Sequence, residues 1–237
     1  MVKRDLHSVI ASKKAIIFDL YHTLTATEVT SPHGLSTATI LGIEKKLWNE
    51  HLMEKSRDRL TGKISDAYTI IKNLAHAIDP SISEKLIQEA TSHRLNRFTV
   101  SLECMPPDSV NALNKLKESG IKLALLSNAD VIETKGWKSC PAVPYFDVVI
   151  FSCEVGYMKP EREIYEICLE RLGEKPNDCV FVGDGGSDEF IGAKNLGIQT
   201  IMVTGIVKRL WPEKLVQIET HADYVIESVS ELVPVKD

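Results

Sequence analysis

The sequence predicts an α/β fold, in which a doubly wound parallel sheet with a Rossmann-like core carries an inserted α-helical domain. From Pro106 onward, short apolar runs with strand character alternate with segments of helical periodicity. Repeated strand and helix units joined by short loops favour a parallel sheet covered on both faces. Between the first strand and about residue 121 no strand pattern occurs, which indicates a helical insertion. The 237 residues, 43% of them apolar, are ample for a sizeable core.

The core elements are expected in a regular order along the chain. An Ile-rich run that starts at residue 15 and ends at Asp19 predicts the first strand. Further strands are expected at residues 121–126, 147–151, 179–182, 199–203 and 224–226. Helices are expected at residues 108–119, 131–138, 161–172 and 187–196, after Pro212, and in a short last segment. Right-handed crossovers would place every strand-to-helix loop at one edge of this sheet.

The insertion is expected to contain three helices, at residues 36–60, 65–77 and 82–98, after a polar loop at residues 25–32. Ser81 or Ser83 is a possible N-cap of the third helix. Both ends of the insertion must return to the sheet. We therefore expect a helical domain at residues 28–98 and a core made of residues 1–27 and 99–237.

Composition restricts the classes of partner. Lys and Arg number 28 against 33 Asp and Glu, so no basic surplus points to nucleic acid or to an anionic membrane. No apolar run approaches the roughly 18 residues of a spanning helix, and residues 1–7 lead into no signal-peptide core. Five scattered cysteines without a C-x-x-C pair predict buried, reduced thiols. These observations favour a cytoplasmic protein; they do not predict an oligomeric state.

Polar side chains follow four of the expected strands. They are Asp19, Tyr21, His22 and Thr23 after the first; Ser127 and Asn128 after the second; Lys159 with Pro160 beyond the third; and Gly183, Asp184 and Asp188 after the fourth. Carboxylates suited to a divalent cation, a lysine and a glycine-rich turn that opens a helix form a phosphate-binding set. Each motif alone has a simple structural explanation, such as a turn or a helix cap. Together, at the same edge of one sheet, they predict an active site.

The four motifs, in this order, resemble those of the haloacid dehalogenase superfamily of hydrolases, and the helical insertion resembles that superfamily's first class of cap domain. The resemblance implies that Asp19 is a nucleophile that forms a covalent intermediate, accompanied by Thr23. It implies that Mg²⁺ is bound by the Asp19 side chain, the main-chain carbonyl of Tyr21 and Asp184. Asp188 would contact the ion either directly or through one of its other ligands. Ser127, the amide of Asn128 and Lys159 would hold the phosphoryl oxygens.

The resemblance also implies a substrate-specificity loop in the cap, and Arg59 and Lys63 lie in the corresponding segment, between the expected first and second helices. The basic residues of the insertion either form a solvated face or bind an anionic substrate. These residues are Arg57, Arg59, Lys63, Arg94 and Arg97.

One position departs from the phosphatases of the superfamily, which carry a second Asp two residues after the nucleophile; here that residue is Tyr21. A phenol is protonated at pH 7 and can donate a proton, but it is a poor base for the second half-reaction. Either another group acts, with His22 or a residue of the insertion as candidates, or the leaving group needs little help. Tyrosine at this position is similar to the haloacid dehalogenases proper. Those enzymes need no metal and have serine where Asp184 stands. The sequence thus favours Mg²⁺-dependent hydrolysis of a small phosphate ester, with carbon-centred dehalogenation or a catalytically silent ligand-binding protein as alternatives.

Overall fold

The computed structural model describes residues 6–30, 35–215 and 219–233. Its described residues form one sheet of six strands in the order β3-β2-β1-β4-β5-β6, and every neighbouring pair is parallel. The strands are β1 Ala15–Phe18, β2 Lys122–Ser127, β3 Val148–Phe151, β4 Cys179–Gly183, β5 Gln199–Val203 and β6 Tyr224–Ile226. All six strands occur where the sequence predicted them, so the predicted parallel α/β core is confirmed.

Strand β1 lies at the centre of the sheet, and all four of its residues are buried. Phe18 pairs with Leu125 on one side and with Val182 on the other. Alternate residues of the strands face two separate hydrophobic clusters, because successive side chains point to opposite faces of a sheet. Ile16 and Phe18 belong to one cluster, and Ala15 and Ile17 belong to the other.

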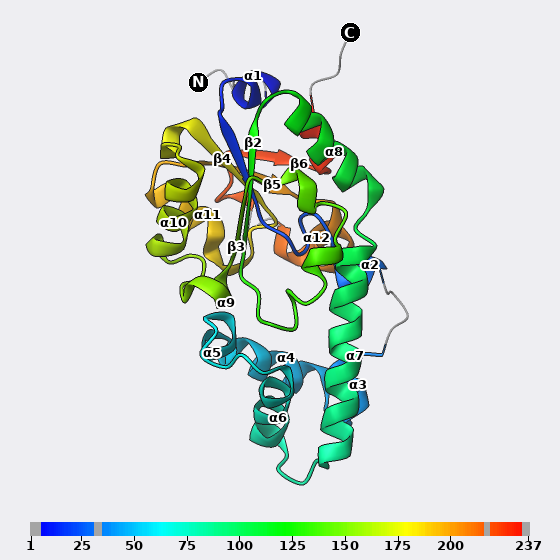
Figure 1. The fold of residues 1–237 in the computed structure, drawn as a ribbon. Coiled ribbons are helices and arrows are strands. Elements are labelled where there is room, and N and C mark those ends of the chain that lie inside the picture. Colours follow the sequence, from blue (N-terminus) through cyan, green and yellow to red (C-terminus); the bar gives the residue numbers. More distant parts are fainter. Residues whose placement is uncertain (1–5, 31–34, 216–218, 234–237) are drawn as a thin grey trace.

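Helices cover both faces of the sheet (Figure 1). On one face, α10 (Arg162–Leu172) and α11 (Glu189–Asn195) contribute Ile164, Tyr165 and Phe190 to the core. On the other, α1 (Leu6–Ala11), α8 (Pro107–Glu118) and a 3₁₀ turn at Val229–Leu232 contribute Ile10, Leu113 and Leu232. This is the doubly wound arrangement, and it places the residues after each strand at one edge.

The segment between β1 and β2 contains a helical insertion that projects from the carboxyl-terminal edge of the sheet (Figure 1). Its helices are α3 (Thr37–Leu41), α4 (Lys45–Glu54), α5 (Ser56–Leu60), α6 (Ala67–Ile78) and α7 (Glu84–Glu103). They pack around a third hydrophobic cluster that includes Trp48, Ile71 and Ile87. We call α3 to α7 the insertion below.

Helix boundaries in the insertion differ from those predicted. The single helix expected at residues 36–60 is three helices, because Gly42 adopts a left-handed conformation after α3 (φ 70°) and α4 ends at Glu54, with Lys55 as its C-cap. Ser83 caps α7, as one of the two predicted serines, but the helix runs five residues past residue 98, to Glu103. The expected loop at 25–32 contains the short helix α2 (Thr27–Thr30), and its last two residues lie outside the described ranges.

The segment after β2 is the largest departure in the core. A helix was predicted at residues 131–138, but the structure has turns followed by a 3₁₀ turn at Trp137–Ser139. Asp130 and Glu133 exchange side-chain-to-amide hydrogen bonds of the kind that opens a helix, and the Thr134 amide donates to the Asp130 carbonyl (3.0 Å). The hydrogen bonds that follow span only three residues, so a single turn forms and no α-helix continues from it. Short helices at α9 (Ser152–Val155) and α12 (Gly205–Leu210), and α1, were not predicted.

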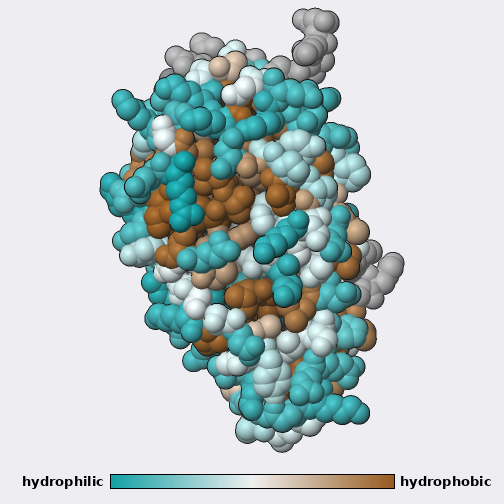
Figure 2. All heavy atoms as spheres, in the orientation of Figure 1, coloured by the Kyte–Doolittle hydropathy of each residue, from teal (hydrophilic) through white to brown (hydrophobic). Residues whose placement is uncertain are grey.

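Near the carboxyl terminus, the helix predicted after Pro212 begins as a 3₁₀ turn at Pro212–Lys214, the described residues 215 and 219 are helical, and residues 216–218 lie outside the described ranges. The short last helix is the 3₁₀ turn at Val229–Leu232. Figure 2 shows hydrophilic residues over the far tip of the insertion and more hydrophobic residues over the core half. None of the described helices is both long and apolar enough to cross a bilayer.

Candidate active site

Asp19 lies directly after β1, where the chain leaves the sheet. Its amide still donates to the carbonyl of Val182 (2.9 Å), which continues the strand pairing by one residue. The side chain is almost completely buried and both carboxylate oxygens are engaged. Oδ1 accepts from Lys159 Nζ (2.6 Å) and Oδ2 accepts from the Thr23 hydroxyl (3.0 Å). Asp19 thus contacts Thr23, four residues further along the chain, and Lys159, which is 140 residues further along.

The Lys159 ammonium lies between two carboxylates. Besides Asp19, its Nζ contacts Glu189 Oε2 (2.6 Å), and it lies 5.3 Å from the centre of the Phe181 ring. Burial lowers the pKa of Lys159, but the carboxylates of Asp19 and Glu189 outweigh burial and hold that pKa above its usual range. The lysine is therefore charged at neutral pH, although only 2% of it is exposed.

Asn128 holds the backbone of Lys159. The Lys159 amide donates to Asn128 Oδ1 (2.7 Å), and Asn128 Nδ2 donates to the Lys159 carbonyl (2.9 Å). This two-bond clamp joins the end of β2 to the segment beyond β3. Ser127 closes β2 and is 1% exposed. Because Phe18 pairs with Leu125, Ser127 lies at the same end of the sheet as Asp19.

Three carboxylates converge beside this lysine. Asp19, Asp184 and Glu189 each offer an oxygen within 4.8 Å of the others. Burial and the Asp19 carboxylate raise the pKa of Asp184. Burial also raises the pKa of Glu189 to about 8, against the opposing effect of the Lys159 ammonium. A set of three acids and one base, buried except for the half-buried Asp184, suits a divalent cation with oxygen ligands such as Mg²⁺.

The sequence analysis did not single out Glu189 and named Asp188 as the second acid of this turn. Asp188 is exposed, whereas Glu189 is 1% exposed and accepts from the Gly185 amide (2.8 Å). The reason lies in the turn after β4, where Ser187 and Asp188 both have positive φ (56° and 51°). Two successive left-handed residues rotate the chain so that the next carboxylate points inward. The sequence signal was only the presence of a second acid at the start of a predicted helix.

The Tyr21 side chain points toward the insertion. Its hydroxyl donates to the carbonyl of Glu133 (2.6 Å), and its ring packs edge-on against Phe98 at 5.2 Å between centroids. Burial and the Glu133 carboxylate raise the pKa of Tyr21 well above its usual value. The phenol is thus bound to a backbone oxygen of the core.

His22 occupies the side of the site near α2. Its Nδ1 lies 3.8 Å from Asp184 Oδ2, its Nε2 lies 3.5 Å from Glu28 Oε2, and its ring contacts that of Trp211. Burial lowers the pKa of His22, but the carboxylates of Glu28 and Asp184 raise it by more. Burial raises the pKa of Glu28, but His22 outweighs this effect and lowers it to about 2.

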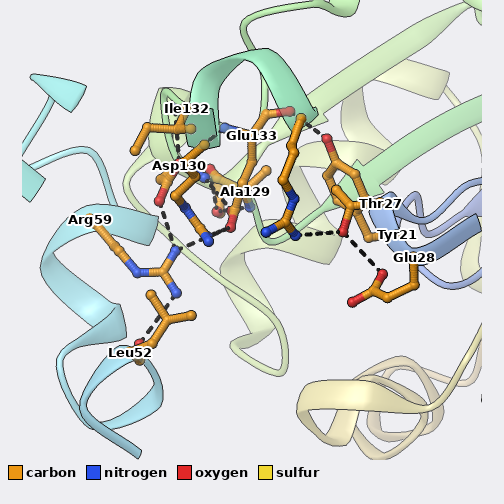
Figure 3. A network of polar contacts seen from close by, with 12 residues as sticks. Tyr21, Thr27, Glu28, Leu52, Arg59, Ala129, Asp130, Ile132 and Glu133 are labelled. Carbon is orange, nitrogen blue, oxygen red and sulfur yellow. Dashed lines mark hydrogen bonds and ion pairs between the residues drawn. The ribbon is translucent and has the colours of Figure 1, made fainter. Parts of the chain in front are cut away.

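The two predicted substrate-binding residues of the insertion differ in their surroundings. Arg59 is 5% exposed, and its Nη1 donates to Asp130 Oδ2 (2.8 Å) and lies 3.5 Å from Glu133 Oε1 (Figure 3). Lys63 is mostly exposed and pairs with Asp58 (3.3 Å). The structure brings neither into contact with the Asp19 group. A solvated face is excluded for Arg59 and for Arg94, which is 7% exposed and also binds Glu133.

Arg59 also lines a cavity of about 310 Å³ between α4, α5 and α6. This cavity lies within the insertion, and its walls include none of Asp19, Lys159, Asp184 and Glu189. We therefore place the candidate active site on the charged cluster at the sheet edge.

Comparison with known proteins shows which family the chain resembles. A family model described as haloacid dehalogenase-like hydrolase matches residues 13–197. A glyceraldehyde 3-phosphate phosphatase of Methanocaldococcus jannaschii is 33% identical over 132 residues, which are 54% of this chain and 55% of the relative. An N-acylneuraminate-9-phosphatase of Mus musculus is 26% identical over 200 residues, or 78% of this chain and 80% of the relative. The match thus spans about half the length of the first of these relatives.

Solved structures of two kinds share the fold. A dehalogenase superposes with a TM-score of 0.66 at 24% identity, covering 95% of this chain and 99% of the other. A phosphatase from Thermococcus onnurineus superposes with a TM-score of 0.59 at 25% identity, covering 92% and 95%. Because the family model matches well over half of the residues, this chain belongs to the haloacid dehalogenase-like hydrolases.

Proposed function

We propose that this hydrolase is a Mg²⁺-dependent phosphatase that cleaves a small phosphate ester through an aspartyl-phosphate intermediate on Asp19. The observation that carries the proposal is the charge imbalance at the sheet edge, where Asp19, Asp184 and Glu189 surround the single ammonium of Lys159. A carboxylate nucleophile and an anionic substrate repel each other, so phosphoryl transfer here requires added positive charge. The two relatives described above are named as phosphatases.

The roles follow from position. Asp19 attacks phosphorus, and the bond to the leaving oxygen breaks; water then hydrolyses the aspartyl phosphate. Lys159, the Ser127 hydroxyl and the Asn128 amide would bind the phosphoryl oxygens, while the side chain of Asn128 holds Lys159 in place. Thr23 orients Asp19 through its hydrogen bond to Oδ2.

Asp19, Asp184 and the main-chain carbonyl of Tyr21 would hold Mg²⁺, which supplies charge neutralisation between nucleophile and substrate. Glu189 has one oxygen on Lys159 and the other on the Gly185 amide, so we assign it to positioning the lysine and to completing the acidic set. Asp188, exposed beside it, remains available to bind a water of the ion.

We further propose that residues 28–98 act as a cap over this site and that Arg59 and Lys63 belong to its specificity segment. The five cysteines are all free thiols, which fits the proposed location in a reducing compartment, the cytoplasm. The predicted burial is correct for three of them and wrong for Cys104, which is exposed, while Cys153 is half-buried.

Dehalogenation is the second candidate, and one observation favours it: Tyr21 stands where superfamily phosphatases carry their acid-base Asp, and its hydroxyl is bound to Glu133. Against it, a metal-free site would leave the carboxylates of Asp19, Asp184 and Glu189 around the Lys159 ammonium, with the His22 imidazole 3.8 Å from Asp184. The two candidates differ in their metal requirement, which is directly measurable.

The test is hydrolysis of para-nitrophenyl phosphate. We expect turnover with Mg²⁺, loss of turnover with chelator, and loss with Asp19→Asn or Asp184→Asn. Glu163→Gln, an exposed acid on α10, is the matched control and should turn over like the unmodified protein. Chloride release from 2-chloropropionate that persists in chelator would overturn the phosphatase assignment. Absence of both activities over a broad panel of phosphate esters would point to a silent ligand-binding protein.

A further inference from the structure

A second cluster of buried charges joins the insertion to the core. Arg59 comes from α5 and Arg94 from α7, while Asp130 and Glu133 come from the turn after β2. All four residues are buried. Arg59 Nη1 contacts Asp130 Oδ2 (2.8 Å) and Glu133 Oε1 (3.5 Å), and Arg94 Nη2 contacts the same Glu133 oxygen (2.9 Å). Figure 3 shows Arg59 reaching across from the insertion to Asp130 and Glu133.

Each carboxylate in this cluster divides its two oxygens between two tasks. Asp130 uses Oδ1 to accept from the amides of Ile132 (2.9 Å) and Glu133 (3.1 Å), and Glu133 uses Oε2 to accept from the Asp130 amide (3.0 Å). The other oxygen of each faces the arginines. The groups that shape the turn are therefore the groups that bind the insertion.

This turn is directly connected to the active site on two sides. Asp130 follows Asn128, whose side chain holds the backbone of Lys159, by two residues. The Glu133 carbonyl accepts the hydroxyl of Tyr21, which follows Asp19 by two residues. A displacement of the turn would reach both the lysine and the segment that carries the nucleophile.

We propose that Arg59, Arg94, Asp130 and Glu133 form an ionic latch that fixes the insertion over the site and, through the same contacts, sets the turn that follows Ser127 and Asn128. Arg59 and Arg94 are then positioning residues for the reaction. Tyr21 is part of the same assembly: it anchors the nucleophile segment to the latch. The kinetic part of this inference rests on the proposed phosphatase function; the structural part does not.

Two features set the latch apart from a stability device. Buried ion pairs can often be replaced by apolar residues of similar size without loss of stability. Four buried charges are therefore better explained by the position of the insertion that they define than by stability. In addition, the Nε atoms of Arg59 and Arg94 have no hydrogen-bond partner in the described structure, so the arginines bind through their terminal nitrogens alone. Unsatisfied buried donors cost stability. The arrangement favours a defined position of the insertion over the lowest energy.

The kinetic experiment compares Arg59→Met with Arg162→Met, an exposed arginine that pairs with Glu166 on α10. Turnover of para-nitrophenyl phosphate is measured below the unfolding temperature of each variant, and circular dichroism establishes that each is folded. We expect kcat/KM to fall at least tenfold in Arg59→Met, partial recovery in Arg59→Lys, and no change in Arg162→Met. Folded Arg59→Met with the unmodified protein's kcat and KM would overturn the proposal.

The second experiment does not depend on activity. Amide hydrogen exchange is followed in residues 56–64 of the insertion and in residues 128–136 of the turn. We expect at least tenfold faster exchange in both segments for Arg59→Met and Arg94→Lys. Arg162→Met should leave the exchange rates of both segments unchanged. Faster exchange in residues 56–64 alone, with the turn unchanged, would overturn the latch. If the unmodified protein hydrolyses no phosphate ester, the proposed function fails and this experiment alone decides the latch.

Discussion

Two buried charge clusters lie at the carboxyl edge of the sheet, and they differ in balance. The latch pairs two arginines with two carboxylates, so its charges cancel. The active-site cluster has the carboxylates of Asp19, Asp184 and Glu189 around the single ammonium of Lys159. Both are largely shielded from water, and both join segments far apart in the sequence.

The difference in net charge indicates what keeps each cluster stable when it is buried. Charges that cancel one another can stay buried without a further ion, because each has a partner at hydrogen-bond distance. An acidic excess raises the pKa values of Asp184 and Glu189 and is relieved by a bound cation. The balanced cluster therefore fits a structural task, and the unbalanced one fits a chemical task. The following changes test this comparison, from the largest expected effect to the smallest.

Lys159→Met should have the largest effect, because it removes the ammonium that contacts both Asp19 and Glu189. We expect kcat to fall by about 10²- to 10³-fold, the cost of losing one preorganised charge at the reacting group. The free energy of unfolding should fall by about 3–5 kcal/mol, because buried carboxylates lose their partner. Steady-state kinetics and urea unfolding measure the two effects, with the exposed Lys46→Met as control. Full activity of the variant would show that Lys159 takes no part in the reaction.

Glu133→Leu tests the balanced cluster. It leaves Arg94 buried without its carboxylate, so we expect a loss of about 3–5 kcal/mol in urea unfolding. Removing both partners, in Arg94→Met with Glu133→Leu, should recover a large part of that loss, because no unpaired charge remains near Phe98. Strictly additive losses in the double variant would show that the two residues act independently.

The pH dependence of stability tests the unbalanced cluster. In the folded, metal-free protein the pKa of Glu189 is raised to about 8, whereas the unfolded chain has an ordinary value near 4.5. The folded state thus binds more protons in this window, so stability should fall as the pH rises from about 4.5 to 8. Thermal unfolding in chelator measures this slope, and Glu189→Gln should flatten it. Stability that rises with pH across the same window would contradict the raised pKa.

Arg57→Met should have the smallest effect. Arg57 also links the insertion to the core, through an ion pair with Glu161, but its side chain is 60% exposed. Exposed pairs contribute little because water screens them. We expect no measurable change in the urea midpoint. A change as large as that of Glu133→Leu would show that any contact between insertion and core suffices, and that burial is not what distinguishes the latch.

Much of the core was predictable because its signals are local. A buried strand followed by a polar residue locates Asp19, Ser127 and Asp184 from a few consecutive letters. Glu189 was not predictable, because its inward direction depends on two positive φ angles at Ser187 and Asp188, which ordinarily favour glycine. The helix predicted at residues 131–138 was wrong because Asp130 and Glu133 open a helical turn that does not continue, and the bonds that follow span three residues.

The ion pairs of the latch could not be predicted from the sequence for a different reason. Arg59 and Arg94 were placed among basic residues that either faced solvent or bound an anion, and their carboxylate partners lie 71 and 39 residues further along the chain. Nothing in the local pattern indicates such a pairing. The same holds for Tyr21, whose partner in the structure is a backbone carbonyl.

One close contact restricts how the segment between α5 and α6 can evolve. Gly62 has a φ of 74°, and a Cβ at this position would overlap the carbonyl oxygen of Cys153 in α9. Its neighbour Lys63 is 68% exposed at the side chain and meets no such limit. A saturation library over this segment should therefore accept many residues at position 63 and only glycine at position 62. Gly62 thus fixes how closely this segment approaches α9. Substitutions at Lys63 can change the charge of the segment without changing that distance.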